Sequence, residues 1–154
     1  NSQLKKTGYR YFNDVLSDQI KTIDWFGVGG LGDSYYKETG QAFVNISPTR
    51  IVTNTLNNYI RDFHLPIPQL LKIDTQGSEL DIIAGCSDFI SSVKYVLLEC
   101  PLIEYNLGAP NLQKYLSTMQ DLGFLPIDVT EVHYMNQMSV QIDIAFVNSL
   151  QDQR

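Results

Sequence analysis

The sequence predicts an α/β domain with a mostly parallel sheet, and three features of its second half support this. Short apolar runs at residues 70–73 and 93–98 are typical of buried strands. Amphipathic segments with helical spacing lie around them, near residues 56–63, 79–90 and 111–122. Such alternation favours parallel strand pairs. Two further strand-like segments, 124–132 and 140–147, are separated by a short turn and predict an antiparallel hairpin at the edge of the sheet.

The N-terminal third is less regular. Residues 9–16 are rich in aromatic and aliphatic side chains and predict a strand that ends at Ser17 and Asp18. Residues 20–46 contain many aromatic residues and glycines, which predicts a hairpin or an irregular excursion. Residues 50–53 are mostly β-branched and predict another strand.

Capping residues define the ends of the three helices. Residues that commonly cap a helix N-terminus precede each amphipathic segment: Thr55, Ser78 and Asn111. Asp81 stands three residues after Ser78 and completes a capping-box pattern. Gly85 and Gly123 are suitable for ending the second and third helices.

Length and composition exclude several classes of protein. A chain of 154 residues is expected to form a single domain, 1–154, with a core of its own. A net charge of −6 argues against a nucleic-acid partner, and no apolar run is long enough to predict a membrane span. Two cysteines, Cys86 and Cys100, are too few for a disulfide framework and predict free buried thiols, which suit a reducing, cytoplasmic environment. The oligomeric state is not predicted.

The segment from Leu70 to Gly85 carries the strongest functional signal. Asp74 ends the apolar run, and a short polar turn leads into the next helix. A carboxylate at the carboxyl end of a parallel strand faces the crevice in which open α/β sheets bind ligands. Asp is also common in turns, so a purely structural role for Asp74 is equally compatible with this pattern alone.

This region resembles the FkbM family of S-adenosylmethionine-dependent methyltransferases. The most specific match is Lys72-Ile73-Asp74-Thr75-Gln76-Gly77-Ser78-Glu79, followed by the apolar helix to Gly85. Further matches are Tyr95-Val96-Leu97-Leu98-Glu99, Leu122-Gly123-Phe124 and, more loosely, residues 15–18, 32–34 and 55–57. The family usually has an acidic residue where this chain has Gln76, and Asp where it has Asn57.

The resemblance implies S-adenosylmethionine as cofactor and a Rossmann-like class I methyltransferase sheet that is incomplete. It places residues 9–18 at the third strand and 70–74 at the fourth strand of seven. The first two strands of that fold hold the methionine and ribose parts of the cofactor, and no segment here corresponds to them. We therefore expect the chain to be the C-terminal part of a methyltransferase domain and to bind the cofactor weakly by itself.

One glycine pattern is misleading. Residues 27–32 match the dinucleotide-binding pattern G-x-G-x-x-G, which requires a preceding strand and a helix that opens at its end. Residues 22–26 could supply the strand, but residues 33–40 have no helical period. We therefore expect a flexible loop rather than a nucleotide-binding element.

Asp74, Glu99 and His133 are the candidate catalytic residues. A hydroxyl acceptor must lose its proton during methyl transfer, and Asp74 is the leading base by its location. Glu99 ends the next strand at the same edge and could bind the acceptor or share a cation with Asp74, but two carboxylates do not define a metal site, and none is predicted. His133 lies near the terminal hairpin and is a second candidate base, although a lone histidine is more often structural.

The resemblance also implies cofactor contacts. Ser17 and Asp18 would lie against the adenine, with Asp74 and Gln76 beside the rest of the cofactor. Lys72 lies within a strand predicted to be buried and is expected to form a structural ion pair.

Two functions remain open at this point. The resemblance implies a methyltransferase that acts on a hydroxyl of a carbohydrate or another small molecule. The alternative is a degenerate or truncated methyltransferase fold that serves as a binding module in a larger protein. Gln76, Asn57 and the missing glycine-rich loop slightly favour this alternative.

Overall fold

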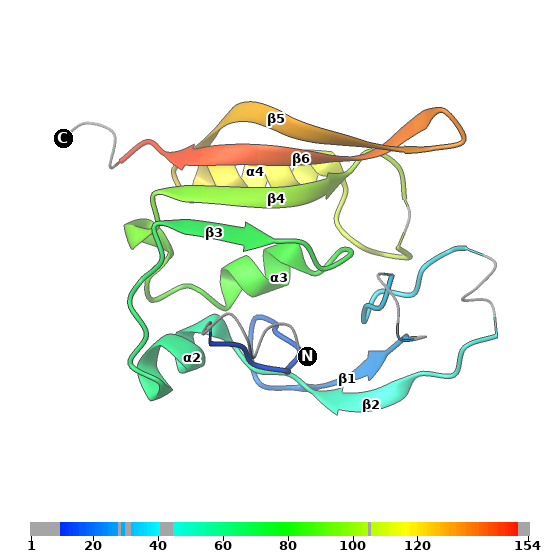
Figure 1. Ribbon diagram of the computed structural model, residues 1–154, viewed down its shortest axis with the longest axis horizontal. Coiled ribbons are helices and arrows are strands. Elements are labelled where there is room, and N and C mark those ends of the chain that lie inside the picture. The colour runs from blue at the N-terminus through cyan, green and yellow to red at the C-terminus, as the bar shows by residue number, and fades with distance from the viewer. Residues whose placement is uncertain (1–9, 28, 30–31, 41–44, 105, 151–154) are drawn as a thin grey trace.

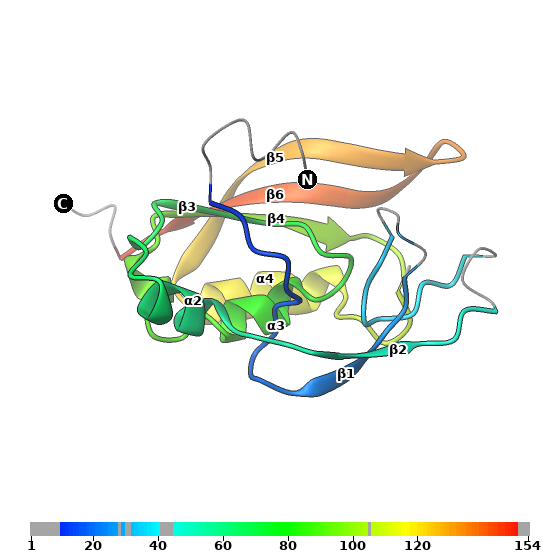
Figure 2. The same ribbon diagram turned by 60° about the horizontal axis from the view of Figure 1, so that its bottom comes forward.

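The fold consists of a four-stranded sheet with helices on one face and a separate two-stranded sheet. The computed structural model describes residues 10–27, 29, 32–40, 45–104 and 106–150. Figures 1 and 2 show α2, α3 and α4 on the same face of the larger sheet, with the small sheet of β1 and β2 below the helices. The opposite face of the larger sheet carries most of the polar residues discussed below.

The larger sheet has the strand order β3-β4-β6-β5. Its strands are β3 (Leu70–Ile73), β4 (Tyr95–Pro101), β5 (Phe124–Met135) and β6 (Met138–Asn148). β3 and β4 are parallel, whereas β6 is antiparallel to both β4 and β5. Three strands therefore run in one direction, and the sheet is mixed. The predicted antiparallel hairpin is confirmed, but its second strand lies inside the sheet and β5 forms the edge.

The helices are α2 (Leu56–Asp62), α3 (Glu79–Ala84) and α4 (Leu112–Asp121). Thr55 and Asn111 cap α2 and α4 as predicted, because their side chains accept the backbone N–H of the residue three positions later at 3.2 and 3.0 Å. α3 is shorter than the predicted segment 79–90, since Gly85 ends it and a turn leads to the 3₁₀ helix η2 (Ile90–Ser92). Gly123 has a φ of +83°, in the left-handed region that favours glycine after a helix.

The predicted capping box at α3 is wrong, although Ser78 does occupy the N-cap position. The Ser78 hydroxyl donates to Thr75 Oγ1 at 2.9 Å instead of accepting a backbone N–H of the helix. Asp81 accepts the hydroxyls of Tyr35 at 2.6 Å and Tyr36 at 3.3 Å. These tyrosines come from a distant loop, so a tertiary contact has replaced the local one.

The predicted strand at residues 9–16 is also wrong. Among residues 10–18, strand-like pairing is limited to a single parallel bridge from Leu16 to Asn54, and Tyr9 lies outside the described residues. The aromatic character of this segment has another explanation. The Phe12 ring packs on Tyr59 of α2 and on Phe63, the residue that caps the end of that helix, with ring centroids 4.6 Å apart in both pairs.

The remaining N-terminal strands form the small sheet. β1 (Thr22–Trp25) pairs antiparallel with β2 (Thr49–Val52). The strand predicted at 50–53 is therefore confirmed, with bounds one residue earlier, and the segment 22–26, which could form a strand, does so. The glycine pattern at 27–32 lies in a loop that an antiparallel bridge between Phe26 and Ser34 closes. No helix follows it within residues 32–40. The helix N-terminus that a nucleotide-binding loop of this kind needs is therefore missing there. Its residues 28, 30 and 31 lie outside the described part of the chain.

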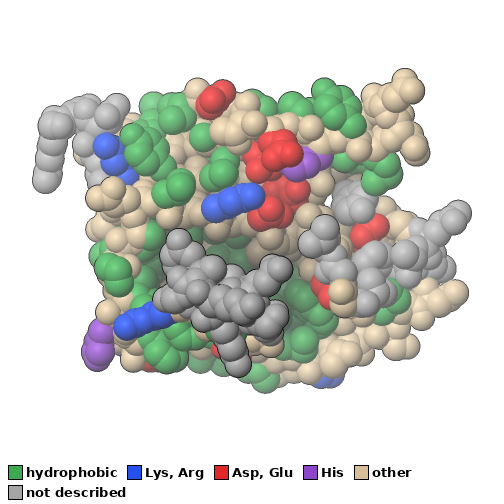
Figure 3. Space-filling view, in the orientation of Figure 1, with side chains coloured by type: hydrophobic (Ala, Val, Ile, Leu, Met, Phe, Trp, Pro, Cys, Tyr) green, Lys and Arg blue, Asp and Glu red, His purple; other side chains and the backbone are tan. Residues whose placement is uncertain are grey.

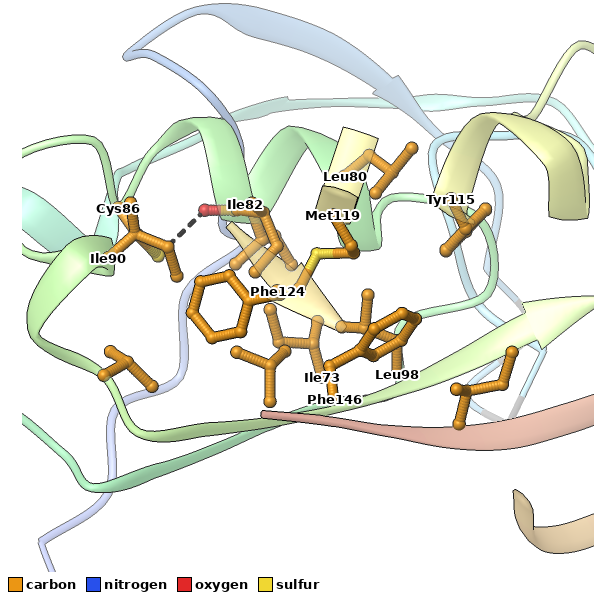
Figure 4. Packing of buried hydrophobic residues seen from close by; sticks show 14 of the residues in the cluster. Ile73, Leu80, Ile82, Cys86, Ile90, Leu98, Tyr115, Met119, Phe124 and Phe146 are labelled. Carbon is orange, nitrogen blue, oxygen red and sulfur yellow. Dashed lines mark hydrogen bonds between the residues drawn. The ribbon is translucent and has the colours of Figure 1, made fainter. Parts of the chain in front are cut away.

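The core lies between the larger sheet and its helices. Figure 4 shows side chains of α3 and α4, among them Ile82 and Met119, meeting Leu98, Phe124 and Phe146 of the strands. The two cysteines are free and completely buried, as expected. Burial raises the pKa of Cys86 to about 12, which keeps its thiol protonated and unreactive. Among the helices of the described residues, none is long and apolar enough to cross a membrane.

Candidate active site

The turn after β3 is shaped by a buried carboxylate that the sequence analysis did not single out. Glu79, the first residue of α3, is completely buried. Its side chain accepts the backbone N–H of Thr75 at 2.8 Å, that of Gly77 at 3.0 Å and the hydroxyl of Tyr115. Gly77 has a φ of +106°, and a Cβ there would lie 2.8 Å from the Cβ of Ala109. Glu79 and Gly77 together fix the path of the turn.

Gln76 connects this turn to the neighbouring strands. It has a left-handed φ of +57°, which is uncommon for a residue other than glycine. Its side-chain amide donates to Glu99 Oε2 at 2.7 Å, and the amide of Gln141 donates to the same oxygen at 3.0 Å. An acidic residue at position 76 would instead place a second carboxylate against Glu99.

Glu99 lies at the carboxyl end of β4 and is only 7% exposed. Burial raises its pKa to about 7, and the nearby carboxylates of Asp74, Glu79 and Asp143 add to this effect. His133 acts in the opposite direction, because its Nε2 lies 3.8 Å from Glu99 Oε1. Glu99 is therefore a buried acid whose like-charged neighbours outnumber its cations.

His133 and Asp143 complete a second polar group on β5 and β6. His133 Nε2 lies 3.0 Å from Asp143 Oδ1, and this hydrogen bond raises the pKa of the histidine. Asp143 is almost completely buried. No local sequence pattern points to Asp143 as a site residue, because its neighbourhood depends on how β6 pairs with β4 and β5. The available signal is limited to its position on the polar face of an alternating apolar strand.

Lys72 forms the predicted ion pair but is not buried. Its Nζ lies 3.3 Å from Asp74 and 3.9 Å from Asp143, and its side chain is 51% exposed. The hydrogen bond to Asp74 is the main cause of the raised pKa of Lys72. The expected burial is wrong because β3 lies at the edge of the sheet and Lys72 faces away from the helices.

Two cavities meet at the turn. The larger, about 720 Å³, lies between the turn, the end of β4 and the start of α4. Its lining contains both apolar and polar side chains, among them Leu102, Ile103, Leu112 and Leu116, and Glu99, Asn106 and Gln141. The smaller, about 220 Å³, is lined by Trp25, three aspartates (Asp14, Asp33 and Asp74) and Gln76, among others. Gly77 lines the larger cavity and Gln76 the smaller, so the turn lies between them.

The methyltransferase FkbM domain model matches residues 17–126 of this chain. The chain belongs to the FkbM methyltransferase domain family. The match includes the turn after β3, all of β4 and both cavity walls that the turn provides. Searches of curated proteins and of solved structures found no match. Membership of a methyltransferase family implies that this FkbM domain uses a methyl donor.

The predicted site residues of the FkbM domain fall into two groups. Asp74 directly follows β3, and Glu99 lies near the carboxyl end of the parallel strand β4, so both lie on the same side of the sheet, as expected. His133 joins Glu99 from β5. Ser17 and Asp18 take part in local contacts, and their predicted contact with the adenine stays a prediction. The Ser17 hydroxyl donates to Asp18 at 2.9 Å, and Asp18 pairs with Lys21 at 2.6 Å. Burial alone would raise the pKa of Asp18, but the bonds from Lys21 and Ser17 lower it.

Proposed function

We propose that this FkbM domain transfers a methyl group from S-adenosylmethionine to a hydroxyl oxygen of a sugar or a secondary metabolite. The observation that carries the proposal is the turn 74–78, which lines a small acidic cavity on one side and a larger, mainly apolar cleft on the other. Methyl transfer requires donor and acceptor to approach each other in line. A turn between two cavities is suited to that arrangement.

The smaller cavity suits the donor. Asp14, Asp33 and Asp74 line it, and carboxylates favour the positive sulfonium of S-adenosylmethionine. Its volume of about 220 Å³ is below the range of roughly 300–1,000 Å³ that is usual for a site that encloses a ligand. The described residues would therefore enclose only part of the donor, and we expect weak donor binding.

The larger cleft suits the acceptor. Its apolar side chains favour an acceptor with an apolar body, and Glu99 and Gln141 offer polar contacts for a hydroxyl group. Asn106 also lines it, and its Oδ1 is a buried atom without a hydrogen-bond partner in the described part of the chain. A hydroxyl of the acceptor could satisfy that oxygen. These walls favour a hydroxylated secondary metabolite over a free monosaccharide.

In the proposed reaction, the acceptor oxygen attacks the methyl carbon as the carbon–sulfur bond breaks. The sulfur keeps the electron pair and leaves as the neutral thioether, and the hydroxyl proton passes to a base. Glu99 is better placed for this role than Asp74, because Glu99 lines the larger cleft whereas Asp74 lines the smaller cavity and pairs with Lys72. His133 contacts Glu99 and is proposed to position it.

A transfer assay tests this proposal. Protein containing residues 1–154 would be incubated with S-adenosylmethionine labelled on its methyl group and with a panel of sugars and polyketide-like alcohols. Glu99→Gln is expected to lower transfer by about 10²–10⁴-fold, the usual loss for a missing general base. Asp74→Asn should mainly weaken donor binding. Asp62→Asn, which changes an exposed aspartate at the end of α2, is the matched control and should leave transfer unchanged.

Two results would contradict the proposal. Donor binding without transfer to any hydroxyl would favour a binding module that is not catalytic. Full activity of Glu99→Gln would place the base elsewhere.

A further inference from the structure

Three neighbouring strands bring like charges into one row. Glu99 of β4 is directly opposite Asp143 of β6, and Asp143 is directly opposite Glu131 of β5. Residues opposite each other on paired strands point to the same face, and like charges in such positions destabilise a sheet. In Figure 3 the acidic side chains gather on this face over the ends of β3 and β4, next to a histidine. The described cationic side chains next to the row are Lys72, 3.9 Å from Asp143, and His133, 3.0 Å from Asp143.

His133 adds a nitrogen ligand to this row. One ligand atom from each of Glu99, His133 and Asp143 lies within 4.8 Å of the other two. His133 Nε2 is 3.0 Å from Asp143 Oδ1 and 3.8 Å from Glu99 Oε1. Two ligand atoms that each lie about 2.1 Å from an ion, in directions at right angles to each other, are about 3.0 Å apart. Small side-chain movements would therefore bring all three atoms into coordination distance.

The surrounding residues already orient these ligands. The side-chain amides of Gln76 and Gln141 both donate to Glu99 Oε2, and Glu99 Oε1 faces His133. In Asp143, Oδ2 lies toward Lys72 at 3.9 Å, and Oδ1 faces the histidine. One oxygen of each carboxylate is thus held by an outer partner while the other faces the same point. Outer partners of this kind are typical of metal sites in proteins.

We propose that Glu99 Oε1, Asp143 Oδ1 and His133 Nε2 bind a divalent transition-metal ion. Three protein ligands that leave positions open are typical of catalytic rather than purely structural metal sites. Imidazole favours Zn²⁺ and related ions and carboxylates suit Mn²⁺, so the mixed ligand set favours these ions over Ca²⁺. The ion would add to the positive charge that Lys72 and His133 already bring to the carboxylate row.

The site borders the larger cleft, because Glu99 and Gln141 line that cleft. A hydroxylated ligand in the cleft could complete the coordination of the ion, and a metal ion lowers the pKa of a bound hydroxyl or water. With the ion bound, Glu99 would be its ligand and not the base, so these two roles of Glu99 are alternatives. The role of the ion in transfer rests on the proposed function, whereas binding of the ion does not. A test without methyl donor or acceptor therefore separates the two proposals.

The test is a titration of chelator-treated protein with MnCl₂ and, separately, with ZnCl₂. Calorimetry would give affinity and stoichiometry, and the loss of the free Mn²⁺ electron-spin signal would give an independent count of bound ions. We expect one ion per chain and at least about tenfold weaker binding in His133→Ala. His133 is about one-third exposed, so this variant should fold. Thermal unfolding of each variant would verify this, and Asp143→Asn would serve as a second test.

His64→Ala is the matched control, since His64 is the other histidine of the sequence and lies exposed after α2. It should bind both ions like the unmodified protein. Three outcomes would overturn the proposal: no binding of either ion up to about 1 mM, unchanged binding in a folded His133→Ala variant, or equal losses in His64→Ala and His133→Ala.

Discussion

Two buried glutamates near the turn after β3 have opposite surroundings. Glu79 faces hydrogen-bond donors: the backbone N–H groups of Thr75 and Gly77 and the Tyr115 hydroxyl. Glu99 has two amide donors on one oxygen but also lies among other carboxylates, including those of Asp74 and Asp143. Donors stabilise a buried carboxylate, and like charges oppose it. Burial alone therefore does not distinguish a structural acid from a functional one.

The difference assigns separate tasks to the two residues. Glu79 fixes the shape of the turn, and through the turn it holds Asp74 and Gln76 at the cavities. Glu99 keeps an unfavourable charge environment at the wall of the larger cleft, and such environments cluster at functional sites. Four substitutions would break or sharpen this comparison.

The largest effect is expected for Glu79→Ala. The substitution leaves the N–H groups of Thr75 and Gly77 and the Tyr115 hydroxyl buried without an acceptor, and each such group costs about 1–3 kcal/mol. We expect a loss of about 3–5 kcal/mol in the free energy of unfolding, measured by urea denaturation. The exposed Glu104→Ala is the control, expected within about 0.5 kcal/mol. A similar small change for Glu79→Ala would refute its structural role.

Tyr115→Phe removes one of these partners without changing the packing of the ring. The Tyr115 hydroxyl is buried and donates to Glu79, and a hydrogen bond to a charged group is worth about 1.5–3 kcal/mol. We expect a destabilisation in that range by urea unfolding. Tyr134→Phe changes a tyrosine that is exposed on β5 and should have almost no effect. Equal effects of the two substitutions would show that Glu79 does not depend on this donor.

Features that depend on local sequence were the ones that could be predicted. The strand 70–73, the caps Thr55 and Asn111, and the terminal hairpin all follow from residues near each other in the chain. Asp74 and Glu99 were correctly predicted to lie on the same side of the sheet, because the carboxyl ends of neighbouring parallel strands point in the same direction.

Features that depend on distant partners were missed. Asp81 has the spacing of a capping box, yet tyrosines 45 and 46 residues away take its carboxylate. Phe12 has the character of a strand residue, yet α2 provides its contacts. Asp143 meets Glu99 and His133 through the register of β6, which no local pattern specifies.

Glu99→Gln should change the pH dependence of stability. Folding raises the pKa of Glu99 from about 4.5 to about 7, so its protonated form is favoured in the native state. The stability that this provides is complete below about pH 4.5 and is lost as the pH rises through 7. In chelator-treated samples, the unmodified protein should lose on the order of 1–2 kcal/mol more than Glu99→Gln between pH 5 and pH 8. Parallel pH profiles in urea denaturation would contradict the raised pKa.

The smallest effect on stability is expected for Asp74→Asn. Asp74 is 46% exposed, and its ion pair with the half-exposed Lys72 is of a kind worth about 0–1 kcal/mol. The substitution should therefore change the free energy of unfolding by less than about 1 kcal/mol. It should nevertheless lower the pKa of Glu99. Burial is the main cause of the raised pKa, and repulsion from the charge of Asp74, which the substitution removes, is the second.

A carbon-13 NMR titration of the Glu99 side-chain carboxyl would measure that change in metal-free protein, with Asp62→Asn as the control. A lower pKa in Asp74→Asn but not in Asp62→Asn would show that Asp74 and Glu99 interact through charge across the turn. An unchanged pKa would mean that Asp74 does not contribute to the raised value. In that case Glu99 would differ from Glu79 in its donors, and the repulsion from Asp74 would play no part in the contrast.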